Sequence, residues 1–204
     1  EEPSQVAAGF IGDASGKKIG VANQLWSSFL LKLQDAIPGA TWATGNEVMR
    51  NLRTRKDEAE IEALAEVGRL TDAAWTEFTE TAQIAGLTEA QAARKLGEMM
   101  EKQGLSWKGG ICASGPNSAS PHHHTGDRVI QRGDAVVFDW GSTYKGYHSD
   151  ITRTVFIGEP TEEFRKVYDI VRRANQAAFE AVKPGVECQA IDKAARDLIA
   201  AEGY

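Results

Sequence analysis

The run VVFDWGSTYKGYHSDITRTVFIG, residues 136–158, constrains the fold of this chain more than any other stretch. It is rich in β-branched and aromatic residues, which favour strands, and small and polar residues at its centre favour a turn. We therefore expect a β-hairpin with arms at 134–140 and 147–157. Asp139 and Asp150 lie inside these arms, where a buried carboxylate is costly unless something pairs with it.

The position of the turn decides how the two aspartates are placed. A two-residue turn centred on Tyr144 and Lys145 would pair Asp139 directly with Asp150, with Cβ atoms about 4.5–5.5 Å apart. Like charges at that separation repel, so a cation is expected between them. Two metal ions about 3.5–4 Å apart, bridged by carboxylates, would suit the gap. A longer, bulged turn and an ion pair with Arg153 are alternatives that the pattern leaves open.

Composition indicates which classes of function are excluded. The chain has 204 residues and a net charge of −6, with Lys and Arg scattered, so we expect no nucleic-acid partner and no membrane partner. No apolar run approaches the roughly 20 residues of a membrane span. Cys112 and Cys188 fit no disulfide framework and no CxxC metal pattern. We expect Cys112 to be a small core residue and the protein to be cytoplasmic.

The order of the expected elements separates the chain into two parts. KKIGVA (17–22) and ATWAT (40–44) are predicted strands joined by a helix, a segment too small to bury its own core. We predict that residues 1–52 are the C-terminal remnant of an N-terminal α/β domain and that 53–204 belong to the next domain. In this second part helices, strands and helices follow one another, which favours an α+β layer fold. Its expected elements are a helix from about Lys56, a helix capped by Thr88 and Gln91, strands over 107–158, a helix opened by Glu159-Pro160-Thr161 and a last helix from about 188.

The loop ASGPNSASPHHHTGDR, residues 113–128, carries three of the four histidines. Successive residues of an extended segment point to alternate sides, so His122, His123 and His124 cannot all face one site. Pro121 stiffens the chain just before His122, which favours one of the imidazoles being aimed at a pocket. His123 and His124 also fit a solvated polar loop, and His148 also fits a strand surface.

Three strings in this order resemble one known family: SGPNSASPHH, GDAVVFDWG and GYHSDITRTVFIG. They resemble metallopeptidases of the pita-bread (creatinase/aminopeptidase) fold, most of all the Xaa-Pro dipeptidases (prolidases) and Xaa-Pro aminopeptidases. The resemblance spans roughly residues 53–204 and implies the first part of a pita-bread catalytic domain, while 1–45 resembles the end of the family's N-terminal domain. Ser120 departs from the family pattern, which usually has an apolar residue, often Leu, before the Pro-His.

The resemblance also implies a site. The family binds two divalent ions through two Asp, one His and two Glu side chains, and Asp139 and Asp150 match the two Asp positions. His122 matches the histidine that contacts the substrate and helps to stabilise or protonate the tetrahedral intermediate. The family's metal-binding His and both Glu ligands would follow Gly203-Tyr204. We therefore expect an internal segment that lacks three of the five ligands.

The implied function of the complete protein is metal-dependent hydrolysis of peptide bonds N-terminal to proline, with the 204-residue chain alone inactive. Carboxylate-rich ligation favours manganese, with cobalt and zinc as alternatives. A proline-containing peptide is the expected substrate, and a homodimer is the expected state of the full-length protein. The resemblance does not separate a dipeptidase from an aminopeptidase. The alternative is a non-catalytic pita-bread module that binds peptides or proteins, and the two intact aspartates argue against it.

Overall fold

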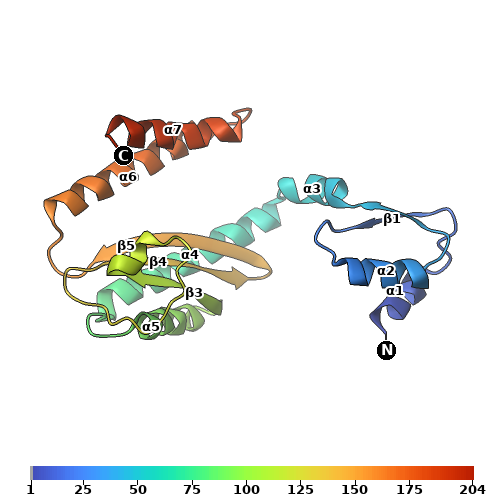
Figure 1. Ribbon diagram of the computed structural model, residues 1–204, viewed down its shortest axis with the longest axis horizontal. Helices are drawn as coiled ribbons and strands as arrows, with labels where there is room; N and C mark the ends of the chain where they lie inside the picture. Colours follow the sequence, from blue (N-terminus) through green and yellow to red (C-terminus); the bar gives the residue numbers. More distant parts are fainter. Residues whose placement is uncertain (1) are drawn as a thin grey trace. The chain divides into compact units, whose positions relative to one another are not determined.

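The structure is a computed structural model that describes residues 2–204. The chain divides into two compact units, Glu1–Glu62 and Ala63–Tyr204. Figure 1 shows the elements of both units in chain order, from blue at the N-terminus to red at the C-terminus. Each unit is described by itself below.

The first unit is a small parallel strand pair with helices. Its strands are connected through a helix, as a parallel pair requires, and Lys18 is paired with Thr41. The strand–helix–strand prediction is confirmed, whereas the first and third helices were not expected. Only Ala14 and Ile37 are buried apolar residues among the described residues of this unit, so its core is very small. The elements are α1 (Pro3–Ile11), β1 (Lys18–Val21), α2 (Ser27–Ala36), β2 (Thr41–Thr44) and α3 (Asn46–Thr54).

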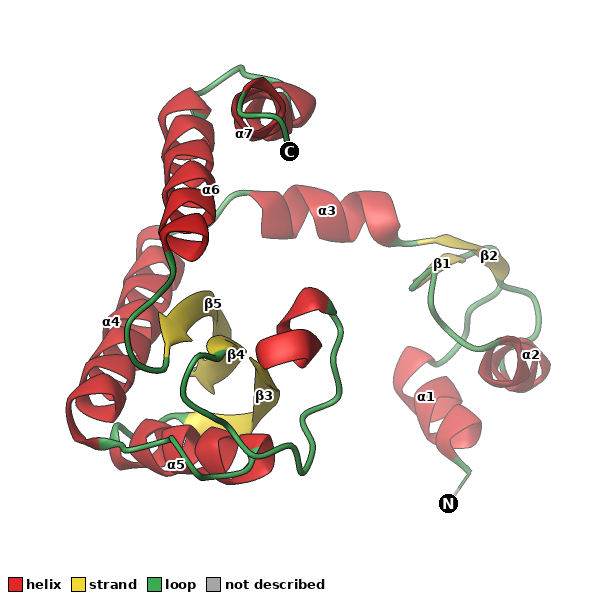
Figure 2. Ribbon diagram, turned by 60° about the vertical axis from the view of Figure 1, so that its left-hand side comes forward, coloured by secondary structure: helices red, strands yellow, loops and turns green. Residues whose placement is uncertain are grey.

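The second unit combines helices with one antiparallel sheet, which confirms the predicted α+β class (Figure 2). The sheet has the strand order β3-β4-β5, so β4 is the central strand and β3 and β5 are edges. The elements are α4 (Glu58–Thr81, which begins before the unit boundary), α5 (Glu89–Lys102), β3 (Ser106–Ser114), the 3-10 helix η1 (Gly115–Ala119), β4 (Ala135–Tyr144), β5 (Tyr147–Phe156), α6 (Glu162–Ala181) and α7 (Cys188–Ala201).

The start of α5 is fixed by the predicted capping box. The Gln91 backbone N–H donates to Thr88 Oγ1 at 3.1 Å, and the Thr88 backbone N–H donates to Gln91 Oε1 at 2.9 Å. Two of the unpaired donors at a helix start are satisfied in this way. The box makes Glu89 the first residue of the helix.

One face of the sheet carries the core. Along β4 every second side chain, at Val136, Phe138 and Trp140, is at most 3% exposed, as the two-residue period of a strand requires. These side chains pack against α4 and α5 in one cluster. The ring of Trp75 in α4 lies 4.8 Å from that of Trp140, and Met100 in α5 is fully buried, as expected for a residue that fills gaps in a core.

The turn of the β4–β5 hairpin lies one residue later than expected from the sequence, which moves the partner of each β4 residue two residues along β5. Tyr144 pairs with Tyr147, so the turn residues are Lys145 and Gly146, with φ of 48° and 82°. A two-residue hairpin turn of this kind needs positive φ at both positions, and glycine adopts it without steric cost. A turn centred on Tyr144 and Lys145 would instead force a bulky tyrosine into that region, which is why the expected turn is wrong.

Candidate functional site

The two aspartates lie on the face of the sheet opposite the core. Asp139 pairs with Thr152, and Asp150 pairs with Gly141. The prediction that the two aspartates pair directly is therefore wrong by two residues. Because the shift is even, both side chains still point to the same face. They are diagonal neighbours, a relation that separates Cα atoms by roughly 7–8 Å.

The aspartates are also less buried than the sequence suggested. Asp139 is half-buried and Asp150 is exposed, so neither carries the burial cost that first singled them out. The alternative pairing with Arg153 is absent as well, because Arg153 belongs to the other face of β5 and its guanidinium lies 3.9 Å from Asp72 Oδ1. The face is open because the core helices cover only the other side of the sheet.

A hollow of about 410 Å³ on this face brings both aspartates together with His148. Its floor depends on a bulge in β3, where the register shifts between Trp107 and Gly110. A Cβ at Gly110 would lie 2.7 Å from Trp140 Cβ and 3.0 Å from the Asp139 carbonyl oxygen. Glycine therefore lets β3 approach β4 beside Asp139, and bulges of this kind often adjoin functional sites.

The two carboxylates differ in their partners. The Thr152 hydroxyl donates to Asp139 Oδ1 at 2.7 Å, which fixes one oxygen and leaves the other available. His148 is held by a 3.0 Å hydrogen bond between its Nδ1 and Thr143 Oγ1. Carboxylate oxygens suit hard divalent cations. The donor set is nevertheless incomplete, because no group of three or more His, Cys, Asp and Glu side chains within residues 2–204 could hold a metal ion.

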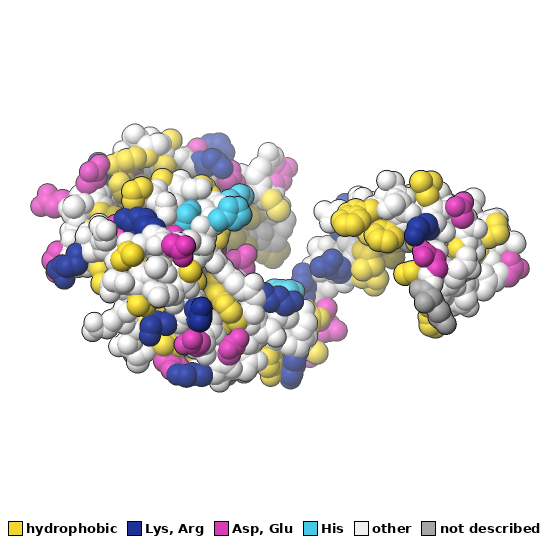
Figure 3. Space-filling view, turned by 60° about the horizontal axis from the view of Figure 1, so that its bottom comes forward, with side chains coloured by type: hydrophobic (Ala, Val, Ile, Leu, Met, Phe, Trp, Pro, Cys, Tyr) yellow, Lys and Arg dark blue, Asp and Glu magenta, His cyan; other side chains and the backbone are white. Residues whose placement is uncertain are grey.

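The three loop histidines do not all face one site, as expected, although His122 lies in a turn rather than in an extended segment. His122 and His124 are exposed, and histidine side chains are visible at the surface in Figure 3. The side chain of His123 points inward and is 18% exposed. His122 is not among the residues that line the hollow, so the structure joins the two aspartates to each other but not to His122.

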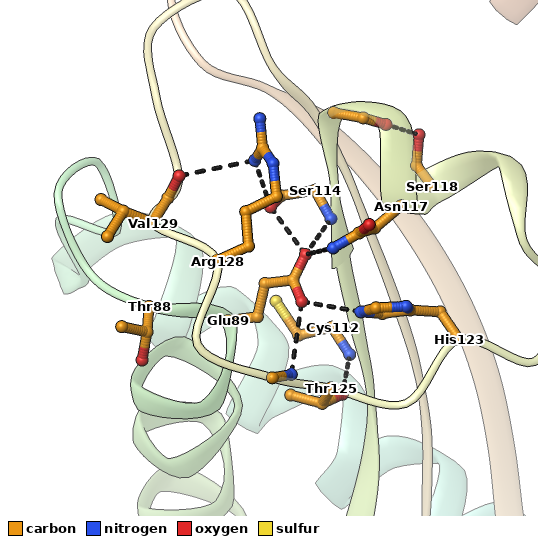
Figure 4. A network of polar contacts seen from close by, with 12 residues as sticks. Thr88, Glu89, Cys112, Ser114, Asn117, Ser118, His123, Thr125, Arg128 and Val129 are labelled. Atoms are coloured by element: carbon orange, nitrogen blue, oxygen red, sulfur yellow. Dashed lines mark hydrogen bonds and ion pairs between the residues drawn. The ribbon is translucent and has the colours of Figure 1, made fainter.

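Glu89 forms a polar centre that the sequence did not reveal. Its side chain is completely buried, and both oxygens accept hydrogen bonds from the end of β3 and the loop that follows it (Figure 4). Oε1 accepts from the Ser114 backbone N–H at 2.7 Å, from Ser114 Oγ at 2.8 Å and from Asn117 Nδ2 at 3.0 Å. Oε2 lies 2.7 Å from His123 Nε2 and accepts from the Gly126 N–H at 3.3 Å.

These contacts keep Glu89 ionised. Burial raises the pKa of Glu89, but the hydrogen bonds from Asn117, His123 and Ser114 together outweigh it and lower the pKa to about 2. The same carboxylate and, above all, burial raise the pKa of Cys112 to about 12. Cys112 is therefore a protonated thiol in the core, as expected from the sequence.

An ion pair encloses the Glu89 centre on its outer side. Arg128 Nη1 donates to Ser114 Oγ at 2.6 Å and to Asp134 Oδ2 at 2.6 Å. The Arg128 guanidinium lowers the pKa of Asp134. Gly115, with φ of 51°, lies against this guanidinium, where a Cβ would come within 2.6 Å of Nη2.

The geometry indicates a class of protein: an antiparallel sheet with helices on one face and two neighbouring carboxylates on the other, with a polar loop rich in histidine between its first two strands. The model of metallopeptidase family M24 matches residues 62–204, so the chain belongs to that family. Membership implies divalent metal ions as cofactors. Within residues 2–204, no helix combines the length and the apolar character that crossing a membrane demands.

Individual relatives agree with this assignment. The probable dipeptidase PepE of Mycobacterium tuberculosis is 40% identical over 185 residues, which are 90% of this chain and 49% of the relative. The Xaa-Pro dipeptidase of Pyrococcus horikoshii is 35% identical over 194 residues, covering 92% of this chain and 54% of that protein. Prolidase from Pyrococcus furiosus matches in structure with a TM-score of 0.83 at 33% identity, over 92% of this chain and 56% of that one.

These matches confirm the resemblance and the fold. The chain has part of the pita-bread fold of the prolidases, and it spans about half the length of the curated relatives that it matches. The family's members include dipeptidases and prolidases, which are peptide hydrolases.

Proposed function

We propose that the complete protein is a metal-dependent peptidase that hydrolyses the peptide bond N-terminal to proline. The observation that carries the proposal is the placement of Asp139 and Asp150 side by side on the open face of the sheet, within one hollow. The proline specificity is supported by relatives named Xaa-Pro dipeptidase and prolidase. The same names do not favour a non-catalytic binding module.

Asp139 and Asp150 would hold the metal ions. The hydroxyl of Thr152 orients Asp139, and Asp150 is open to the hollow. When bound, divalent ions polarise a substrate carbonyl and lower the pKa of water. Two carboxylates are too few donors for two such ions, which each need about four to six. The proposal therefore requires further ligands from outside residues 2–204.

His122 would contact the substrate and stabilise or protonate the tetrahedral intermediate. Its imidazole is exposed, and the loop that carries it is anchored from the inside through the neighbouring His123. An exposed imidazole on an anchored loop can meet a substrate without first leaving an internal partner.

Four finer features belong to the proposal. Manganese is the proposed metal, because both ligands are carboxylates. The complete protein would be a cytoplasmic homodimer. Residues 1–52 would be the end of an N-terminal α/β domain, and 53–204 the first part of the catalytic domain.

Replacing Asp150 tests the proposal most directly. In the complete protein, Asp150→Asn should remove most of the bound metal and nearly all hydrolysis of an Xaa-Pro dipeptide, because a neutral amide is a much weaker ligand. Asp72→Asn is the matched control, since Asp72 is an exposed carboxylate beside Arg153 in the same unit. Elemental analysis and a dipeptide assay are the measurements. Full metal content in Asp150→Asn would rule out the ligand role.

Replacing His122 separates substrate chemistry from metal binding. We expect His122→Ala to lower kcat by about 10²–10⁴-fold, the usual contribution of a general acid or base, while metal content stays at the wild-type level. His124→Ala is the control, because His124 is exposed on the same loop. If only His124→Ala impaired kcat, the proposed assignment of the loop histidines would be incorrect.

A further inference from the structure

Glu89 is a buried anion whose partners all belong to the end of β3 and the loop that follows it. The five donors come from residues 114–126, which lie 25 to 37 residues further along the chain. None of these residues, and not Glu89 itself, lines the hollow that holds Asp139 and Asp150. Glu89 therefore has no contact with the proposed reaction centre.

Polar contacts hold this loop in place. From residue 115 to residue 128 every side chain is exposed or half-buried, so the loop has no apolar anchor in the core. A buried carboxylate without partners is very costly, and removing even one partner of a buried hydrogen bond leaves a penalty. The loop conformation that satisfies Glu89 is consequently favoured over others.

The contact with His123 decides which imidazoles face outward. With the His123 side chain turned inward to Glu89, its neighbours His122 and His124 lie on the outside, and both are exposed. A backbone hydrogen bond from the His123 N–H to the Ser120 carbonyl oxygen at 3.2 Å also shapes this turn. The contact with Glu89 is what holds the His123 side chain itself inward, since Asn117 and the Thr125 hydroxyl bond to groups on either side of the histidines.

We propose that Glu89 is a positioning residue that, through His123, fixes the direction of His122 toward the substrate. The inference rests on the proposed function, in which His122 contacts the substrate. His123 has no chemical step in this arrangement, because its Nε2 is engaged by Glu89 at 2.7 Å. The only property required of residue 123 is then an N–H donor that reaches Glu89 Oε2.

Paired variants of the complete protein test this role. Glu89→Gln keeps the size of the side chain but replaces an acceptor oxygen by an amide donor that faces N–H groups. His123→Gln keeps an N–H donor about as far from the backbone as imidazole Nε2, whereas His123→Leu removes it at similar volume. Asp134→Asn is the matched control, because it breaks the enclosing ion pair with Arg128 and leaves the contacts of Glu89 in place.

The kinetic prediction has two parts. Glu89→Gln and His123→Leu should lower kcat by about 10²-fold with KM changed by less than about threefold, the cost of displacing a reacting group by about 1 Å. His123→Gln should recover kcat to within about threefold of wild type. Asp134→Asn should lower the melting temperature, because it breaks the ion pair with Arg128, yet keep kcat close to that of wild type, which separates positioning from a loss of stability.

Two kinetic outcomes would overturn the inference. One is a wild-type kcat in Glu89→Gln, and the other is a kcat in His123→Gln as low as in His123→Leu. The second outcome would give the imidazole itself a chemical role. The His123 pair also keeps the inference testable if Glu89→Gln does not fold, because Glu89 is intact in both His123 variants.

A measurement without substrate distinguishes failure of this inference from failure of the proposed function. Amide hydrogen exchange of residues 115–127 should be at least about tenfold faster in Glu89→Gln and His123→Leu than in wild type, as expected when a locally stabilising contact is lost. Exchange at the wild-type rate would overturn the inference even if Xaa-Pro hydrolysis is found. Faster exchange would support the anchoring role even if the substrate proves to be another peptide.

Discussion

Carboxylates in the second unit meet two opposite environments. Both oxygens of Glu89 are occupied by five donors in a fully buried position. Asp139 has one oxygen bound by Thr152, and Asp150 is exposed. The same chemical group is therefore enclosed by the polypeptide at Glu89, whereas at the two aspartates it lies on the open face of the sheet with fewer partners.

The buried carboxylate of Glu89 makes the free energy of unfolding depend on pH in the acidic range. The pKa of Glu89 is lowered in the folded protein from its usual 4.5 to about 2. A lowered acid pKa contributes stability above the unfolded-state pKa and loses it as the pH falls through the folded-state pKa. Hence the free energy of unfolding gained from Glu89 should be constant above about pH 5.5 and decline between about pH 5 and pH 2.

A comparison with Glu89→Gln isolates this contribution. The difference in unfolding free energy between wild type and Glu89→Gln, measured with denaturant at several pH values, should shrink as the pH falls. Other acids whose pKa is lowered, such as Asp134, are present in both proteins and largely cancel in the difference. A difference that grows toward low pH would contradict the assigned ionisation.

At the scale of single residues, the sequence pattern drew attention to the two aspartates but not to Glu89. Asp139 and Asp150 were noticeable because an acidic residue within an apolar strand pattern is unusual. Glu89 is the first residue of a helix, where acidic residues are common because the helix dipole favours them. The neighbouring sequence does not distinguish Glu89 from a solvent-exposed glutamate, because its burial depends on a loop that comes after α5 and β3.

At the scale of elements, the β4–β5 hairpin carries both aspartates, and its turn sets their register. Lys145 is the only non-glycine residue with positive φ among residues 2–204. A positive φ costs an ordinary L-residue about 1–2 kcal/mol, and asparagine before glycine is the favoured pair in such turns. The natural turn is therefore not the most stable one for this geometry.

We expect Lys145→Asn to raise the free energy of unfolding by about 0.5–1 kcal/mol, because asparagine tolerates this conformation better than lysine does. Gly146→Ala should lower it by about 1–2 kcal/mol for the converse reason. Denaturant unfolding of both variants is the measurement. Changes of the same sign in the two variants would contradict the turn assignment.

The elements themselves were largely predictable, and the failures have physical causes. The capping box at Thr88 and Gln91, the core-facing side of β4 and the helices α4 to α7 follow from local patterns. Helices α1 and α3 are nine residues each, a length at which helices have little stability of their own, so their sequences carry a weak signal. The strand pattern alone does not fix the register of the hairpin, because the position of the turn depends on the positive φ that Gly146 adopts.

At the scale of the whole molecule, the second unit has apolar surface that its own residues do not cover. β5 is a sheet edge, and α6 exposes a row of large apolar side chains. An open edge beside an apolar surface favours association with another chain. The exposed side chains of α6 are Tyr168 (47%), Val171 (54%) and Phe179 (73%).

The 204-residue chain, expressed by itself, should consequently self-associate. Sedimentation velocity over a range of concentrations should show species larger than a monomer, and Val171→Lys should shift the distribution toward the monomer by placing a charge beside the β5 edge. Val171 lines a groove of about 510 Å³ between β5 and α6, so it is well placed for this test. A chain that stays monomeric at every concentration would contradict the expectation.

The two faces of β4 also limit how this protein can change over evolutionary time. Its alternating residues serve the core on one side, through Phe138 and Trp140, and the open face on the other, through Asp139. A substitution affects one of these sides, but an insertion or deletion of a single residue within the strand exchanges them completely. The length of β4 between Ala135 and Tyr144 is therefore under stricter constraint than the identity of most of its residues. Natural variation in this region should accumulate as replacements, with changes of length confined to the connections outside the strands.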